Sequence, residues 1–256
     1  MADAVICTDG AELDAALEAL ARRLSGAGNA GLKVIGLINR PTERAISRLP
    51  QGTQEQLERL TAKALERAMD AASASQGILS RHPWADTASL AAAGALGGLG
   101  GLPSALVELP VTVTLMARVV QGQARAHGYD PDEMQTRRDC LLAFAAEGPV
   151  AGRDGADLGF LATRLTLTGA SVRAGIGMVA PRVAALIGRS LATRAVPVLG
   201  AATGAAVNAS YAGYYRDMAG VVFGLRRLSE ESGLPFDELG QQLRRRAETL
   251  PLSDAS

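Results

Sequence analysis

The feature that most constrains the fold of this chain is a long segment without charged side chains, rich in alanine, glycine and leucine. Between Asp86 and Glu108 the sequence reads TASLAAAGALGGLGGLPSALV. Residues 196–215 have the same character and read VPVLGAATGAAVNASYAGYY. Small side chains let helix backbones approach closely, but each contributes little burial energy, so such segments need closely packed partners. The two segments therefore predict central helical hairpins that pack tightly.

The rest of the chain is patterned for helices. Leucine recurs at helical spacing in residues 11–24, and Gly128 within HGYDPDE is typical of a helix end. Pro197 and Pro235 stand where prolines open helices. A strand could form at residues 32–38, but one strand without partners is unstable. We therefore predict an all-α fold, a multi-helix bundle with Gly/Ala-rich, closely packed central helical hairpins.

Several helix boundaries can be predicted from capping residues and prolines. Thr53 is expected to cap one helix, and Asp130 to cap another, with Glu133 completing a capping box. A proline inside a helix removes a backbone hydrogen bond. We therefore expect the first apolar segment to form two helices, divided near Pro103 or Pro110.

The sequence pattern divides the chain into three parts. Residues 1–31 hold a leucine-rich helix and a Gly-rich linker, residues 32–250 form the main helical domain, and residues 251–256 form a short tail. A chain of 256 residues is long enough to bury a substantial core.

Composition argues against several classes of function. The chain has 26 basic and 26 acidic residues and 4% aromatic residues, whereas a nucleic-acid-binding protein needs a positive surface and stacking aromatic rings. Cys7 and Cys140 are too far apart in sequence to suggest a metal-binding pair or a disulfide framework. The first residues, MADAVICTDGAELDAA, lack the basic region of a secretory signal. We therefore expect a cytoplasmic protein that binds no nucleic acid.

No sequence motif points to a reaction. Residues 26–31 have the spacing GxGxxG, but they follow a predicted helix, whereas a dinucleotide-binding loop follows a strand. His82 and His127 are the only histidines, which is too few for the usual zinc sites. We expect no metal and no cofactor, and we favour a non-enzymatic protein.

A carboxylate in an apolar stretch marks the best candidate site. Glu108 must pair with a cation, be protonated or face water. Arg118 and Arg216 are possible partners, and Asn208 in the second apolar segment could complete a polar cluster. The cluster is either a structural ion pair or a polar pocket for a ligand.

Glycines four residues apart recur in both apolar segments, and this spacing places them on one helix face. The predicted helix-packing glycines are Gly94, Gly97, Gly98, Gly101, Gly200 and Gly204. Gly220 and Gly224 repeat the spacing further along. Such faces suit a packed soluble hairpin, a hairpin that contacts a membrane, or self-association.

Four stretches within residues 32–228 carry a resemblance to a known family: LINRPTERAISRLP, HPWADTASLAAAGALGGLGGLP, ELPVTVTLMARVVQGQARAHGYDPDE and AVPVLGAATGAAVNASYAGYYRDMA. In these stretches the chain resembles the EcsC family of bacterial proteins. The resemblance implies a helical cytoplasmic protein of a family named for an operon that encodes an ABC transporter. It implies no established reaction, cofactor or catalytic residue.

The apolar segments and the resemblance together predict association with a membrane. We expect a cytoplasmic protein that associates peripherally with the inner face of the membrane, through lipid or a transporter-like membrane complex. One alternative is a binder or hydrolase of a small molecule or lipid that uses a polar pocket around Glu108, Arg118 and Asn208. Another is a scaffold that self-associates into a homo-oligomer through its Gly-xxx-Gly faces.

Overall fold

The computed structural model describes residues 10–27, 51–70, 88–89, 91–93, 101–146, 171–192 and 197–250. In these ranges every regular element is an α-helix and no strand occurs, which confirms the predicted all-α, multi-helix fold. None of the described helices combines the length and the apolar character needed to cross a membrane. The possible strand at 32–38 and the tail at 251–256 lie outside the described residues.

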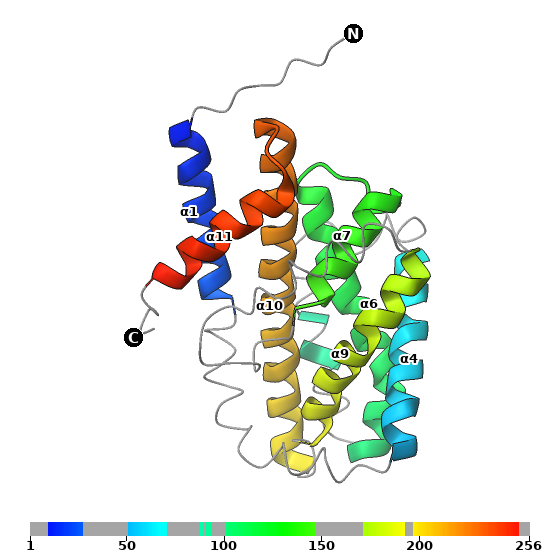
Figure 1. Cartoon of the computed structure of the whole chain (residues 1–256). Helices are drawn as coiled ribbons and strands as arrows, with labels where there is room; N and C mark the ends of the chain where they lie inside the picture. Colours follow the sequence, from blue (N-terminus) through cyan, green and yellow to red (C-terminus); the bar gives the residue numbers. More distant parts are fainter. Residues whose placement is uncertain are drawn as a thin grey trace.

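The helices pack on both sides of one long central helix. Their bounds are α1 Gly10–Gly26, α4 Gln51–Asp70, α6 Gly101–Ala126, α7 Met134–Phe144, α9 Val172–Ala192, α10 Pro197–Ser232 and α11 Phe236–Thr249. Figure 1 shows α4, α6, α7 and α9 on one side of α10, and α1 and α11 on the other. The helices that open at Pro197 and after Pro235 begin where the sequence predicts.

Helices α6 and α10 run side by side in the same direction. The ring of His127, just after α6, lies 6.2 Å from the ring of Phe223. Tyr129 lies under the guanidinium of Arg226, which follows Phe223 along α10. Because later residues of one helix meet later residues of the other, both helices begin at the same end of the bundle (Figure 1).

This parallel course brings the two apolar segments together. We call residues 101–117 of α6 and 197–215 of α10 the charge-poor half of these two helices, because Glu108 is their only charged residue. Val113 and Met116 of α6 and Val207 of α10 are almost completely buried in this half, together with two polar side chains, Thr112 and Asn208. Helices α6 and α10 thus pack against each other, while the close packing expected of the Gly/Ala-rich segments themselves stays a prediction.

The expected division of the first apolar segment at a proline is wrong. Residues 88–89 and 91–93 are helical, and α6 then runs unbroken from Gly101 through both Pro103 and Pro110. Pro103 falls in the first turn, where its missing N–H has no partner in any helix. Pro110 is a true interior proline, and α6 continues through it while packing along its length against α4 and α10.

The expected capping box at the start of α7 is also wrong. The helix begins at Met134, later than a cap at Asp130 requires. The Asp130 carboxylate accepts a hydrogen bond from the backbone N–H of Asp132 instead, in a local turn. Glu133 occupies the N-cap position without a side-chain cap bond, because its carboxylate bonds to Thr136 and Arg226.

The other expected helix signals have mixed outcomes. Gly128 ends α6 with a positive φ of 86°, as its sequence context predicts, and the N–H of Tyr129 donates back to the carbonyl of Ala124. The cap expected at Thr53 is wrong, because α4 already begins at Gln51.

Two glycines of α10 allow α1 to pack closely against it. A Cβ atom at Gly220 would lie 2.1 Å from Cζ of Arg23, and one at Gly224 would lie 2.7 Å from Cδ2 of Leu20. The leucine stripe predicted for α1 faces this contact, since Leu17 and Leu24 are buried. This Gly-xxx-Gly face therefore packs within the chain.

We predict opposite outcomes for two glycine-to-alanine changes on α10. Gly213→Ala should raise the free energy of unfolding by about 0.5–1 kcal/mol, because alanine favours the helix and the new Cβ meets nothing within 4 Å. Gly224→Ala gains the same helix propensity but forces Leu20 to move, so its free energy of unfolding should be about 1 kcal/mol or more below that of Gly213→Ala. Urea unfolding followed by circular dichroism measures both values. Equal stabilisation by the two changes would contradict the seating of α1 on Gly224.

Candidate functional site

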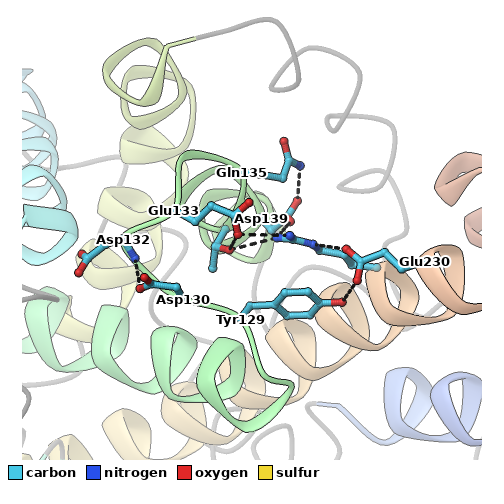
Figure 2. Close-up of polar contacts among 9 residues, drawn as sticks. Tyr129, Asp130, Asp132, Glu133, Gln135, Asp139 and Glu230 are labelled. Carbon is cyan, nitrogen blue, oxygen red and sulfur yellow. Dashed lines mark hydrogen bonds and ion pairs between the residues drawn. The ribbon is translucent and has the colours of Figure 1, made fainter. Parts of the chain in front are cut away.

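The most developed polar cluster in the described residues surrounds Arg226, where α10 meets the start of α7. The guanidinium donates from Nη1 to Oδ2 of Asp139 at 3.1 Å and to Oγ1 of Thr136 at 3.1 Å. Its Nε donates to Oε1 of Glu230 at 2.9 Å, and Nη2 donates to Oε2 of Glu133 at 3.4 Å. Figure 2 shows these carboxylates converging on one guanidinium from α7, its preceding turn and α10. We call these residues the Arg226 network.

Burial differs sharply among the members of the network. The Asp139 side chain is 1% exposed and that of Arg226 is 11% exposed, whereas Glu133 and Glu230 are about half exposed. Nε2 of Gln135 donates to the second oxygen of Asp139 at 3.2 Å. Although burial opposes the charge of Arg226, hydrogen bonding to Glu230 and the surrounding carboxylates raise its pKa above the ordinary value. Both carboxylate oxygens of Asp139 thus accept hydrogen bonds, and the surrounding carboxylates favour the charged form of Arg226.

Tyr129 extends the network with an aromatic ring. The Arg226 guanidinium lies 4.0 Å from the centre of this ring, and the Tyr129 hydroxyl donates to Oε2 of Glu230 at 2.8 Å. The ring also packs against Phe223 at 5.7 Å between centres. Burial and the hydrogen bond to Glu230 raise the pKa of Tyr129. The ring therefore holds the turn after α6 against α10.

The contacts of the Arg226 network indicate a structural role. Its central carboxylate already faces a guanidinium, and within the described ranges no three His, Cys, Asp or Glu side chains are placed to share a metal ion. Buried ion pairs of this kind fix one arrangement of helices, because the alternatives leave a charge buried alone. The network joins the turn between α6 and α7 to α10.

Sequence reasoning missed the Arg226 network. Its partners are separated by 87 residues for Asp139 and 93 residues for Glu133, so no local spacing links them. The pair Arg226 and Glu230, four residues apart on one helix, was the one available signal.

The structure places three of the four residues of the predicted polar cluster. Asn208 is 1% exposed inside the bundle, while Arg118 of α6 and Arg216 of α10 are half-buried, and each of the three takes part in a polar or electrostatic contact. Glu108 lies in α6, but its side chain is outside the described residues. The carbonyl of Arg216 accepts a hydrogen bond from Nη2 of Arg23 at 3.3 Å. The cluster as a whole stays a prediction.

The predicted packing glycines fall into three groups. Gly94, Gly97 and Gly98 lie outside the described residues. Gly101 is the first residue of α6 and Gly200 lies in the first turn of α10. The contacts of these two glycines are not among the described features. Gly204 is buried in α10. Close helix approach is therefore seen at the later pair, Gly220 and Gly224, while the role of the predicted six stays a prediction.

Comparison with known proteins finds a family model that matches part of the chain. The model of the EcsC protein family matches residues 46–153, a range that contains α4, α6 and α7. No curated protein and no solved structure matches the chain. The Arg226 network therefore joins the family segment, through Glu133 and Asp139, to a helix beyond it.

We predict that neighbouring arginines of α10 differ greatly in their contribution to stability. Arg226→Met leaves the buried Asp139 carboxylate without its cation, which should lower the free energy of unfolding by about 3–5 kcal/mol. Arg227→Met is the matched control, because Arg227 pairs with Glu231 at an exposed position and its loss should change little. Chemical unfolding of both variants measures the difference. Similar stabilities would show that the Arg226 network does not hold α7 to α10.

Stability should fall in alkaline solution. Burial raises the pKa values of Cys140 and Tyr215, and burial together with Glu230 raises that of Tyr129. In the unfolded chain a thiol loses its proton near pH ~8.5 and a phenol near pH ~10. Above these values the folded state binds more protons than the unfolded state, so the free energy of unfolding falls as pH rises.

Urea unfolding between pH 7 and pH 10.5 measures this decline. In a Cys140→Ala variant the thiol no longer contributes, so the decline should begin near pH ~10, where the tyrosines titrate. A stability that stays constant up to pH ~10.5 would contradict the burial of these groups.

Proposed function

We propose that this chain, which matches the model of the EcsC protein family over residues 46–153, is a non-enzymatic helical protein that associates peripherally with a membrane. The charge-poor half of α6 and α10 is the contacting part. We place this association at the inner face of the cytoplasmic membrane, either with lipid directly or with a protein complex in it.

One observation carries the proposal: α6 and α10 are parallel, so both apolar segments lie in the same half of the molecule. Two such segments at opposite ends would give no single apolar surface. Here the two segments lie side by side, and α10 has no charged residue from Pro197 to Tyr215. Where segments of this kind leave a contiguous apolar surface, that surface is typical of protein or membrane interaction sites.

An exposed apolar side chain in this half supports the proposal. Val111 is 52% exposed on α6, beside Pro110 and next to the end of the uncharged segment. The other end of the bundle is strongly polar, since it carries the Arg226 network and the exposed ion pair of Arg227 with Glu231. This polarity along the bundle axis orients the molecule, with its charged end toward water.

We predict that one charge in the charge-poor half weakens membrane binding. Burial of an apolar side chain contributes about 1.5–3 kcal/mol, so Val111→Glu should reduce the fraction of protein that floats with liposomes by about tenfold or more. Met134→Glu is the matched control, because Met134 is 54% exposed but lies at the start of α7, at the polar end. Its flotation should equal that of the unmodified chain. The assay uses detergent-free protein and liposomes with and without anionic lipid.

Two results would contradict the proposal. The unmodified, folded chain could remain at the bottom of the gradient with every lipid, or the two substitutions could reduce flotation equally. Circular dichroism of both variants confirms that they are folded before flotation is compared.

The two alternative functions stay predictions. A binder or hydrolase would use polar groups inside the bundle, and the burial of Asn208 favours a polar interior near α6. Gln121 of α6 donates to the carbonyl of Ala68 of α4. Thr61 lies seven residues before Ala68, which is about two turns of the helix. Oγ1 of Thr61 is buried and has no hydrogen-bond partner. A self-associating scaffold would use glycine faces other than the one that α1 covers.

A further inference from the structure

Arginine side chains lie at the border of the charge-poor half of α6 and α10, and we infer that they bind the anionic headgroups of a phospholipid surface. They are Arg22 and Arg23 at the end of α1, Arg118 of α6 and Arg216 of α10, and we call them the border arginines. The inference rests on the proposed membrane association and names the class of lipid that this part of the molecule contacts.

The border arginines of α6 and α10 lie at about the same height along the bundle. His127, just after α6, packs beside Phe223 of the parallel helix α10. Arg118 comes nine residues before His127, and Arg216 comes seven residues before Phe223. At a rise of about 1.5 Å per residue, their heights differ by about 3 Å. Both arginines also make a contact within the chain, so a lipid phosphate would be an additional partner.

The end of α1 brings two more arginines to this height. Arg23 donates from Nη2 to the carbonyl oxygen of Arg216 at 3.3 Å, and from Nε to Oδ1 of Asp217 at 3.1 Å. Arg22, the neighbour of Arg23, is exposed. Three helices that are far apart in sequence therefore place cationic side chains at one level of the bundle.

The sign of the charge changes along the bundle. The stretches at the height of the border arginines hold four arginines and one acidic residue, and they are residues 19–26, 113–123 and 211–221. Towards the polar end, residues 127–133 and 233–240 hold five acidic residues and no arginine or lysine. All five of these acidic side chains are exposed. An anionic surface attracts the border arginines and repels the polar end, so it would turn the charge-poor half toward itself.

The outward face of α6 favours a lipid surface over a free anion. Val111 is 52% exposed, and Arg118 follows it by seven residues, about two turns, so the two lie on one face of the helix. Leu115, partly buried, lies between them. An arginine beside apolar side chains can lay its aliphatic stem along apolar surface while its guanidinium binds a phosphate. A free anion would gain nothing from the apolar neighbours.

Flotation of the full chain with vesicles of two compositions tests the inference. One set is phosphatidylcholine alone, and in the other set part of it is replaced by the anionic lipid phosphatidylglycerol. The unmodified chain should float better with the anionic set, and added salt should reduce the difference. Arg22→Gln combined with Arg118→Gln should lower partition onto anionic vesicles by about tenfold or more, because each arginine near such a surface adds to binding. Partition onto neutral vesicles should not change.

The matched control removes the same charge nearer the polar end. It combines Arg125→Gln of α6 with Arg227→Gln of α10, both at exposed positions, and its partition should stay close to that of the unmodified chain. Circular dichroism checks that each variant is folded. If the border variant is unfolded, the exposed single substitution Arg22→Gln is compared with Arg227→Gln alone, and the first should lower anionic partition several-fold while the second should not.

The outcomes separate this inference from the proposed function. If the unmodified, folded chain floats with neither set of vesicles, the proposed function is wrong and the inference is wrong with it. If it floats equally well with both sets, membrane association stands and the inference is wrong. If the border and control substitutions lower anionic partition equally, net charge rather than the border arginines is responsible, and the inference is again wrong.

Discussion

The buried ion pair between Arg226 and Asp139 is the contact on which the arrangement of the helices depends. It links α10 to α7, and through Tyr129 it links α10 to the turn that follows α6. A buried pair is often no more stabilising than well-packed apolar side chains, but every arrangement that separates it leaves a charge buried alone. Its role is therefore to select one register of α10 against α6 and α7. The ion pairs of Arg226 with the half-exposed Glu133 and Glu230 orient the guanidinium but contribute little to the free energy of unfolding.

The register that this pair selects gives the bundle its polarity. With the ends of α6 and α10 joined at Tyr129 and Arg226, the beginnings of both helices must lie together at the opposite end. Those beginnings carry the end of the first apolar segment and most of the second, so one set of polar contacts places these residues in one half. A bundle in which α10 ran antiparallel to α6 would place one apolar segment at each end. The proposed membrane contact thus depends on a polar network in the other half of the molecule.

Local signals predicted much of the fold, and long-range contacts account for most of the errors. Helical periodicity and the residues Gly128, Pro197 and Pro235 act through backbone geometry within one or two turns, so the sequence alone identifies them. Glu133 had the spacing of a capping residue, but it bonds to Arg226 instead, which lies 93 residues away. The continuous course of α6 through Pro110 likewise depends on packing against α4 and α10. A propensity argument cannot include partners that only the tertiary fold supplies.

The glycine pairs show the same limit for the candidate site. The spacing of Gly220 and Gly224 indicates that another backbone or side chain can approach α10 closely, but it carries no information about which one. The approaching helix is α1, from the start of the chain, and it is identified by Arg23 and Asp217 rather than by the glycines. A small-residue face provides space, while charged residues at its border choose the occupant. By the same reasoning, the function of the glycines in the charge-poor half depends on the polar residues that border them, and Arg118 and Arg216 are the first charged residues beyond that half on α6 and α10.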